Sequence, residues 1–417
     1  MSEFSEKCRE ILLATGTNVY QLSQMSGLDR TSLQRMITGK RLPRLSFVRE
    51  FCSYLRIDSD EKKELLELYE AERIGKAAFE NRKYAEKFLR DLDEGNLLPP
   101  FPSQLSRESL KAINSFLGDC FSQEFFSEIF TNLPGFQDFF YQKLLHMKEA
   151  FKKELPVYHL LDFYPNPEHF PEGRKNMETI SGILFPFLNG YMDYHPRCFY
   201  NKTSTLSSHL LFPYYLGSRN SLLLFTGDFS SFLQIRTSSV CKACYEEFFH
   251  IWESASAFIL PAWEDREDLS LYTSAPVSCG LNYFPLDLES SFSSPAKPLY
   301  LFSPESLAEI LRARQDSAAA AEFFTKKGSL FLLKEEMLPI KNVCIKIFSD
   351  YSLSITLPLK ESKKLSVYLK ESGTGFAFLD YFTALSQGDA VYTDLRQSRI
   401  LDWLLKSLHN TAGFPPA

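Results

Sequence analysis

The stretch Leu22–Pro43, LSQMSGLDRTSLQRMITGKRLP, determines the fold that the sequence predicts for the N-terminal part of the chain. Its apolar residues recur with helical spacing on both sides of Gly27, which can adopt the left-handed backbone conformation of a tight turn. Asp29 has the side chain of a helix N-cap, and Gly39 is typical of a helix end. We therefore predict two short helices that pack through Leu22, Met25, Leu33, Met36 and Ile37.

Two more helices are expected to flank this pair, so that residues 1–57 form an all-α domain of four to five helices. The first helix has an apolar face made of Phe4, Cys8, Ile11 and Leu12. Asn18 begins the next helix and is followed three residues later by Gln21, a variant of the capping box. The last helix is expected over about Leu45–Leu55.

The charge of the chain is unevenly distributed. Its formal net charge is −6, but residues 1–56 contain nine basic and five acidic residues. Because salt screens charges beyond about 8–10 Å, a phosphate backbone responds to this local excess and not to the total. The N-terminal part therefore has the charge expected of a nucleic-acid-binding domain within an otherwise acidic chain.

These features resemble the Cro/repressor-type helix-turn-helix, also called the XRE family, over about the first 57 residues. The resemblance implies that double-stranded DNA is the partner and that the second helix of the pair enters the major groove. The base-reading residues that it implies are Arg30, Thr31, Gln34 and Arg35. The phosphate contacts that it implies are Asn18, Lys40, Arg41 and Arg44. Ile37 departs from the family, which usually tolerates a polar residue there. The alternative interpretation is a small helical bundle with solvated charges.

The rest of the chain is predicted to be a large α+β region, which makes the protein multidomain. Two Pro-containing linkers are expected, at Gly95–Gln104 and Ser290–Pro298. We recognise no internal repeat. The predicted parts are connecting or dimerisation helices at 58–94, broken near Gly75, a sensor domain at 104–289 and a C-terminal subdomain at 299–417.

Apolar spacing predicts further elements in this region. Helices are expected at Arg107–Leu117, Gly135–Leu155, Val240–Phe258, Gly375–Leu385 and Leu395–Leu408. Strands are expected at Ser221–Thr226, Phe229–Ile235, Val343–Phe348, Leu353–Leu357 and Leu365–Leu369, and the first two are expected to form a hairpin. The segment Ser221–Ser256 is similar to sensor domains of bacterial regulators, which implies an effector.

Side chains that could support chemistry are isolated along the sequence. Cys241 and Cys244 form a single CxxC without a second pair of ligands, so we expect no structural metal. Gly373-Thr374-Gly375 lacks the rest of a phosphate-binding loop and is predicted to be a turn. The other candidates are His195-Pro196-Arg197-Cys198, Glu246-Glu247 and Trp263-Glu264-Asp265. We expect no catalytic residues, no cofactor and no enzyme activity.

The sequence thus predicts a cytoplasmic transcriptional regulator, a repressor, that binds DNA as a homodimer. Eight scattered cysteines fit a reducing compartment, and no signal peptide or membrane span is recognised. The C-terminal region is expected to respond to a small-molecule or peptide effector. One alternative is an enzyme or defence effector that the N-terminal motif tethers to DNA. Another is an interaction scaffold, because the chain contains 38 Phe residues.

Overall fold

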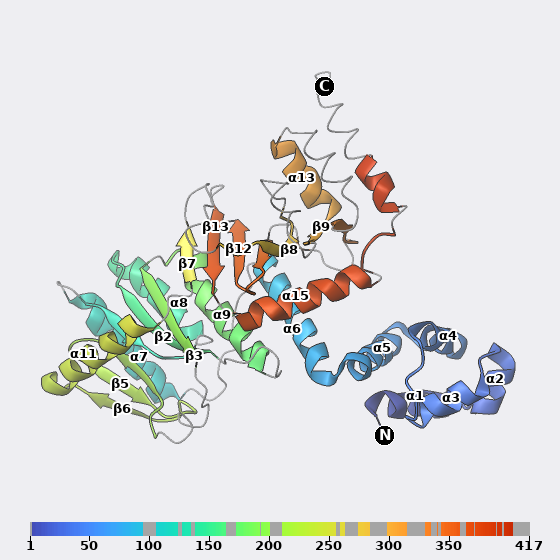
Figure 1. The fold of residues 1–417 in the computed structure, drawn as a ribbon. Coiled ribbons are helices and arrows are strands. Elements are labelled where there is room, and N and C mark those ends of the chain that lie inside the picture. The colour runs from blue at the N-terminus through green and yellow to red at the C-terminus, as the bar shows by residue number, and fades with distance from the viewer. Residues whose placement is uncertain are drawn as a thin grey trace. The chain divides into compact units, whose positions relative to one another are not determined.

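The computed structural model divides the chain into two compact units, Met1–Lys83 and Tyr84–Ala417 (Figure 1). The predicted linker at 95–104, the predicted linker at 290–298 except for its last residue, and the predicted acidic run Trp263-Glu264-Asp265 lie outside the residues that the structure describes. The described residues are 2–94, 106–123, 127–134, 138–163, 172–191, 193–200, 211–255, 259–262, 274–283, 298–314, 330–334, 340, 343–358, 364–370, 372–388, 390–393 and 396–402.

The first unit is helical throughout and has a single core. Its helices are α1 (Glu3–Ala14), α2 (Val19–Ser26), α3 (Arg30–Ile37), α4 (Leu45–Leu55), α5 (Ser59–Ile74) and the first part of α6 (Lys76–Glu94). Leu65 and Tyr69 of α5 are buried in the same cluster as Leu33 of α3 and Phe51 of α4. The core of this unit therefore extends past the predicted boundary at residue 57, because α5 contributes buried side chains to it.

The helix ends in this unit follow from their capping residues. Backbone N–H groups donate to four N-cap side chains, those of Ser2, Asn18, Asp29 and Asp58. Gly27 ends α2 with φ 73°, a left-handed conformation that side chains other than glycine rarely adopt. The predicted place of Met25 in the core is wrong, because its side chain is 77% exposed. In the eight-residue α2, Leu22 alone is buried.

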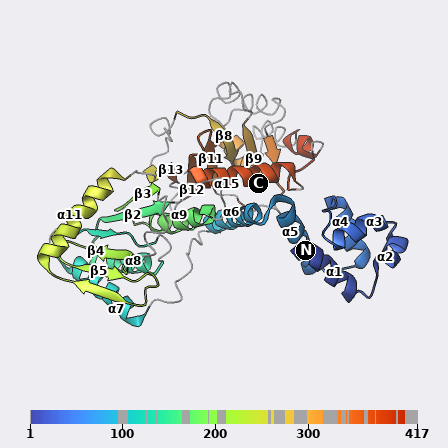
Figure 2. The same cartoon turned by 60° about the horizontal axis from the view of Figure 1, so that its bottom comes forward.

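The second unit contains a six-stranded sheet in the order β3-β2-β1-β4-β5-β6. The first three strands are parallel and the last three antiparallel. Helix α11 packs on one face of the sheet, and α7, α8 and α9 pack on the other (Figure 2). The elements are α7 (Arg107–Ser122), β1 (Ile129–Thr131), α8 (Asp138–Phe151), β2 (Val157–Phe163), α9 (Glu172–Leu188), β3 (Tyr194–Tyr200), β4 (Tyr214–Gly217), β5 (Leu222–Phe225), β6 (Phe232–Ile235) and α11 (Ser238–Ser254).

A second, seven-stranded sheet follows in the order β10-β9-β8-β11-β12-β13-β7. Strands β8, β9 and β10 are parallel, and every other pairing is antiparallel. Helix α15 packs on this sheet through Phe378 and Phe382. The elements are β7 (Ile259–Ala262), β8 (Val277–Leu281), β9 (Leu299–Phe302), α13 (Pro304–Arg314), β10 (Leu330–Leu332), β11 (Cys344–Phe348), β12 (Leu353–Pro358), β13 (Lys364–Leu369) and α15 (Ser372–Gln387).

Apart from β7, the two sheets have the same topology. In each, three parallel strands run in chain order from the centre to one edge, and three antiparallel strands run in chain order from the centre toward the other edge, where β7 is added in the second sheet. A helix follows the last strand directly in both, α11 after β6 and α15 after β13. An asparagine also follows the first strand of each: Asn132 Nδ2 donates to the carbonyl of Pro213, and Asn282 Nδ2 to that of Val343. The second unit is therefore built from two structural repeats, which the sequence did not reveal.

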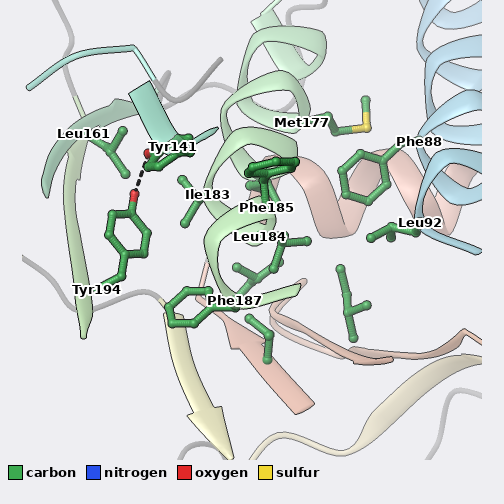
Figure 3. Close-up of a cluster of buried hydrophobic side chains, with 14 of the residues drawn as sticks. Phe88, Leu92, Tyr141, Leu161, Met177, Ile183, Leu184, Phe185, Phe187 and Tyr194 are labelled. Atoms are coloured by element: carbon green, nitrogen blue, oxygen red, sulfur yellow. Dashed lines mark hydrogen bonds between the residues drawn. The ribbon is translucent and has the colours of Figure 1, made fainter. Parts of the chain in front are cut away.

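One hydrophobic core extends through the second unit. Phe88 and Leu92 of α6 lie beside Met177 of α9 (Figure 3), and the rings of Phe88 and Phe378 of α15 are 5.6 Å apart. The part of α6 after Lys83 therefore belongs to the second unit by its packing. A polar network lies inside the same core, where the hydroxyls of Tyr141 and Tyr194 are 3.0 Å apart.

The structure confirms an α+β second unit, and most of the helices and strands predicted there are present. These are α7, α8, α11, α15, the hairpin β5–β6 and the strands β11 to β13, and residues 396–402 are helical within the predicted last helix. The predicted turn at Gly373–Gly375 is wrong, because these residues form the first turn of α15. Gly375 is needed there because a Cβ would lie 1.8 Å from the Tyr351 carbonyl oxygen. No described helix is long and apolar enough to cross a membrane.

Candidate nucleic-acid interface

Helices α2 and α3 are joined by a short turn that their own side chains stabilise. The N–H of Gly27 donates to the Ser23 carbonyl at 3.0 Å, and Ser23 Oγ donates to the Leu28 carbonyl at 2.8 Å. Asp29 then caps α3 by accepting the N–H of Ser32 at 2.7 Å. Hydrogen bonds from the side chain and then from the backbone N–H of Ser32 lower the pKa of Asp29, so its carboxylate stays charged at neutral pH.

One face of α3 is buried and the other is exposed. Leu33, Met36 and Ile37 are buried in the core of the first unit. The four predicted base-reading residues, Arg30, Thr31, Gln34 and Arg35, are all exposed. The burial of Ile37 explains an apolar residue at that position. Helix α3 therefore presents a polar, cationic surface to solvent while its other side fixes its orientation.

The segment after α3 carries the predicted phosphate-contacting residues. Gly39 has φ 69°, and the N–H of Lys40 donates to the Arg35 carbonyl at 2.9 Å. The side chains of Lys40, Arg41 and Arg44 are exposed. Tyr69 of α5 is buried and donates its hydroxyl to the Pro43 carbonyl at 2.9 Å. This hydrogen bond ties the segment 38–44 to the core.

A pocket of about 660 Å³ connects α3 with this segment, α4 and α5. Four arginines line it, and they are Arg35, Arg41, Arg44 and Arg73. The lining also contains one carboxylate, Glu50, and Arg73 forms an ion pair with Glu70. The pocket is therefore cationic, and it brings Arg35, predicted to read bases, next to Arg41 and Arg44, predicted to contact phosphates. Arg73 was not predicted, because residues 58–94 were interpreted only as connecting or dimerisation helices.

Several cationic side chains elsewhere in the first unit are paired with carboxylates. Lys7 contacts Glu64 at 2.8 Å, Lys76 contacts Glu3 at 3.1 Å, and Lys83 pairs with Glu67. Within the described part of the chain, no ion pair involves five basic residues on and after α3, which are Arg30, Arg35, Lys40, Arg41 and Arg44. Positive charge is therefore left uncompensated on this surface.

Two residues at the start of α2, its N-cap Asn18 and Tyr20, are exposed. Asn18 is exposed, and its Oδ1 accepts the N–H of Gln21 at 2.9 Å while Gln21 accepts the N–H of Asn18 at 3.2 Å. One of the two polar atoms of the Asn18 side chain is thus used in capping. Tyr20, which is 56% exposed, lies 5.4 Å from the guanidinium of Arg30 in a cation–π contact. Tyr20 was not predicted, because aromatic residues at exposed helix positions carry no sequence signal of their own.

The other candidate groups are in the second unit. Cys241 is buried in α11, and its Sγ lies 3.5 Å from the Ile235 carbonyl, while Cys244 is half-buried. His195 forms a hydrogen bond with Asp193 at 2.7 Å, and Glu246 and Glu247 are exposed on α11. Among the described residues, no three His, Cys, Asp or Glu side chains are grouped as metal ligands.

His159 is a buried ionisable group that the sequence did not single out. Its Nε2 lies 2.6 Å from the Leu133 carbonyl, and its Nδ1 lies 2.6 Å from the Tyr194 hydroxyl. The carbonyl can only accept, so Nε2 carries the proton and Nδ1 accepts from Tyr194. Burial lowers the pKa of His159 to about 4. Both of its nitrogens are satisfied within the core, which is what a structural role requires.

Comparison of the chain with models of known protein families, with curated proteins and with solved structures found no match.

Proposed function

We propose that this protein is a sequence-specific transcriptional regulator that binds double-stranded DNA through a helix-turn-helix formed by α2 and α3. The observation that supports this proposal most strongly is the group of five uncompensated cations on and after α3, which are Arg30, Arg35, Lys40, Arg41 and Arg44. Lysines of α1 and α6 are paired with carboxylates, so what distinguishes α3 and the segment after it is that five such cations are concentrated there. Clustered cations without counter-charges attract a polyanion.

Within this proposal, α3 reads the base edges. Arg30 and Arg35 are suited to bidentate contacts with guanine, Gln34 to contacts with adenine, and the Thr31 methyl to contact with thymine. The buried residues of α3 hold these side chains in place from the opposite side. The cation–π contact with Tyr20 restricts the guanidinium of Arg30 before DNA binds, which lowers the entropy lost on binding.

The phosphate backbone is contacted around α3. Lys40, Arg41 and Arg44 supply charge on one side, and the pocket that they border adds Arg73 from α5. Asn18 contributes the Nδ2 group that its capping interaction leaves as a donor. Such contacts set the position of the protein on DNA without selecting the sequence.

The proposal extends to regulation by the second unit. A DNA reader of this size needs no further core, so we assign the role of effector response to Tyr84–Ala417. The expected regulator acts as a repressor and binds as a homodimer, because one module reads only a few base pairs. An effector changes DNA affinity only through different affinities for two states of the protein, typically about 1–3 kcal/mol.

The salt dependence of binding tests the electrostatic part of this proposal. Fluorescence anisotropy with a labelled duplex gives the observed binding constant between low and physiological salt. The four cations assigned to phosphates predict a slope of roughly −3.6 for log K against log salt concentration per protein chain, and Lys40→Ala should reduce that magnitude by about 1. Lys63→Ala, an exposed lysine on α5, is the matched control and should leave the slope unchanged. Equal slopes in Lys40→Ala and the parent chain contradict the assignment.

A further inference from the structure

The two repeats of the second unit differ at one sheet edge. In the second sheet, β13 is the last strand of the repeat, and β7 pairs with its outer edge through four residue pairs. Strand β7 follows α11, so it comes from the segment that joins the two repeats. In the first sheet, β6 occupies the position of β13, and among the strands that the structure describes none pairs with its outer edge. One repeat is therefore completed by a neighbouring segment, whereas the described residues contain no such strand for the other.

The hydrogen-bond pattern shows which atoms β6 presents at this edge. The N–H of Thr226 donates to the Ser231 carbonyl, and the strand register then pairs Leu224 with Leu233. Antiparallel ladders alternate between hydrogen-bonded and non-hydrogen-bonded pairs, so Leu233 bonds inward to β5. Phe232 and Gln234, one residue to either side, direct their backbone N–H and C=O groups outward.

The side chains of β6 do not protect this edge. Natural sheets usually block an open edge with a charge, a proline or a bulge. The four residues of β6, Phe232-Leu233-Gln234-Ile235, contain neither a charge nor a proline, and their register with β5 is regular. Leu233 is 46% exposed, although it lies on the same face as Leu224, which packs in the α11 cluster. A partner that covers this edge would gain both backbone hydrogen bonds and apolar contact.

We propose that β6 pairs with β6 of a second copy of this chain, in an antiparallel arrangement centred on Leu233. This register places Phe232 opposite the partner's Gln234, and the outward N–H and C=O groups of each pair meet in four hydrogen bonds. It also places Leu233 opposite the same residue of the partner as a non-hydrogen-bonded pair, in which side chains are closest. A self-complementary, two-fold contact of this kind closes on itself and gives a dimer.

A second copy fits this edge better than an unrelated strand for a reason found within the chain. The equivalent edge at β13 already accepts an antiparallel strand from the segment that joins the repeats, so strand pairing at this edge is part of the architecture. The symmetric register of β6 uses every outward-facing backbone group that the ladder leaves free. This inference concerns the second unit and does not depend on the proposed DNA binding.

A cysteine at position 233 tests the pairing directly in the full-length chain. Facing residues of a non-hydrogen-bonded pair have Cα atoms about 4.5 Å apart, within the range that a disulfide bridges. Leu233→Cys should therefore form a covalent dimer under mild oxidation, seen on a non-reducing gel. The controls are the parent chain, whose cysteines are buried or half-buried, and Leu211→Cys, whose site is 83% exposed. Cross-linking of Leu233→Cys no greater than that of Leu211→Cys overturns the proposal.

Analytical ultracentrifugation supplies the second readout. The parent chain should sediment with twice its monomer mass of 48.0 kDa. Leu233→Lys opposes two like charges, and Gln234→Pro removes an outward N–H, so each should weaken dimerisation on the order of tenfold or more. Leu211→Lys should remain dimeric, and circular dichroism shows that the variants are folded. A monomeric parent chain, or folded Leu233→Lys and Gln234→Pro variants that dimerise like the parent, would contradict the pairing.

Discussion

Tyr69→Phe isolates the hydrogen bond that ties the basic segment 38–44 to the core. The hydroxyl donates to the Pro43 carbonyl at 2.9 Å, and the ring packs edge-on against Phe4 with centroids 5.5 Å apart. The substitution keeps the ring and removes only the hydroxyl. A net hydrogen bond contributes about 0.5–1.5 kcal/mol, and Pro43 is only half-buried, so water can replace the lost donor. We therefore expect a loss of about 1 kcal/mol.

Hydrogen exchange measured by mass spectrometry is the suitable assay, because all three tryptophans of the chain lie in the second unit. A loss of about 1 kcal/mol corresponds to roughly fivefold faster exchange of the amides that open with this segment. These include the N–H groups of Lys40 and Phe47, which donate to the carbonyls of Arg35 and Arg44. Affinity for DNA should fall by about two- to fivefold on every sequence, because Arg41 and Arg44 lose their fixed positions.

The matched control is Tyr54→Phe, which removes a hydroxyl from a 50% exposed tyrosine of the same unit. It should change neither exchange nor affinity. Burial raises the pKa of Tyr69 above its ordinary value of 10, so the hydroxyl still donates its hydrogen bond at pH 10. The stabilisation that this hydrogen bond supplies is lost only as the pH rises through the raised pKa. If Tyr69→Phe exchanges and binds DNA like the parent chain, the segment is not held by this hydrogen bond.

Three further predictions follow from other parts of the structure. Gly27→Ala should destabilise the first unit by about 1–2 kcal/mol, because Gly27 has a φ of 73°. Gly118→Ala, at a position of α7 where an added Cβ meets no other atom, should stabilise the second unit by about 0.5–1 kcal/mol. Equal effects of the two substitutions in urea denaturation would refute the turn argument. Because the pKa of His159 is lowered to about 4 in the folded protein, this histidine is protonated more readily in the unfolded chain. The free energy of unfolding of the second unit should therefore fall by about 3 kcal/mol as the pH is lowered from 6.5 to 4. A His159→Gln variant with the same dependence of stability on pH would exclude this cause. A fragment ending at Lys83 should bind DNA without responding to the physiological signal. The fragment ends there and not at residue 94 because Ala85, Phe88 and Leu89 are buried in the second unit. A fragment that responds like the full chain would show that the second unit is not the sensor.

The first unit was the part that the sequence predicted best, because its signals are local. Asn18, Asp29, Gly27 and Gly39 each determine a helix end through their own backbone and side chain, and the structure uses all four in this way. Met25 was misassigned because helical spacing alone does not show which side of an eight-residue helix meets the core. The contributions of Tyr69 and Arg73 were missed because they depend on how α5 packs, which is a tertiary property.

The second unit was predicted only in outline for a related physical reason. The strands with clear alternation or apolar runs, such as β5 and β11, were found. The parallel strands were not, since β1 has three residues and β2 is buried at five of its seven positions, including His159. Parallel strands covered on both faces lose the alternating pattern that marks a half-exposed strand. The repeat was missed because it is preserved in the order and direction of strands, and the asparagine after each first strand is too isolated to reveal it.

Selection of bound sequences from a random pool of duplexes tests the central claim most directly. The full-length chain should enrich a defined motif. Arg35→Ala should lose discrimination at one position of that motif and bind its preferred site about 1–3 kcal/mol more weakly, while Lys40→Ala should enrich the same motif with lower affinity. No enrichment by the parent chain, or the same motif with undiminished discrimination from Arg35→Ala and Arg30→Ala, would contradict the claim that α3 reads DNA sequence.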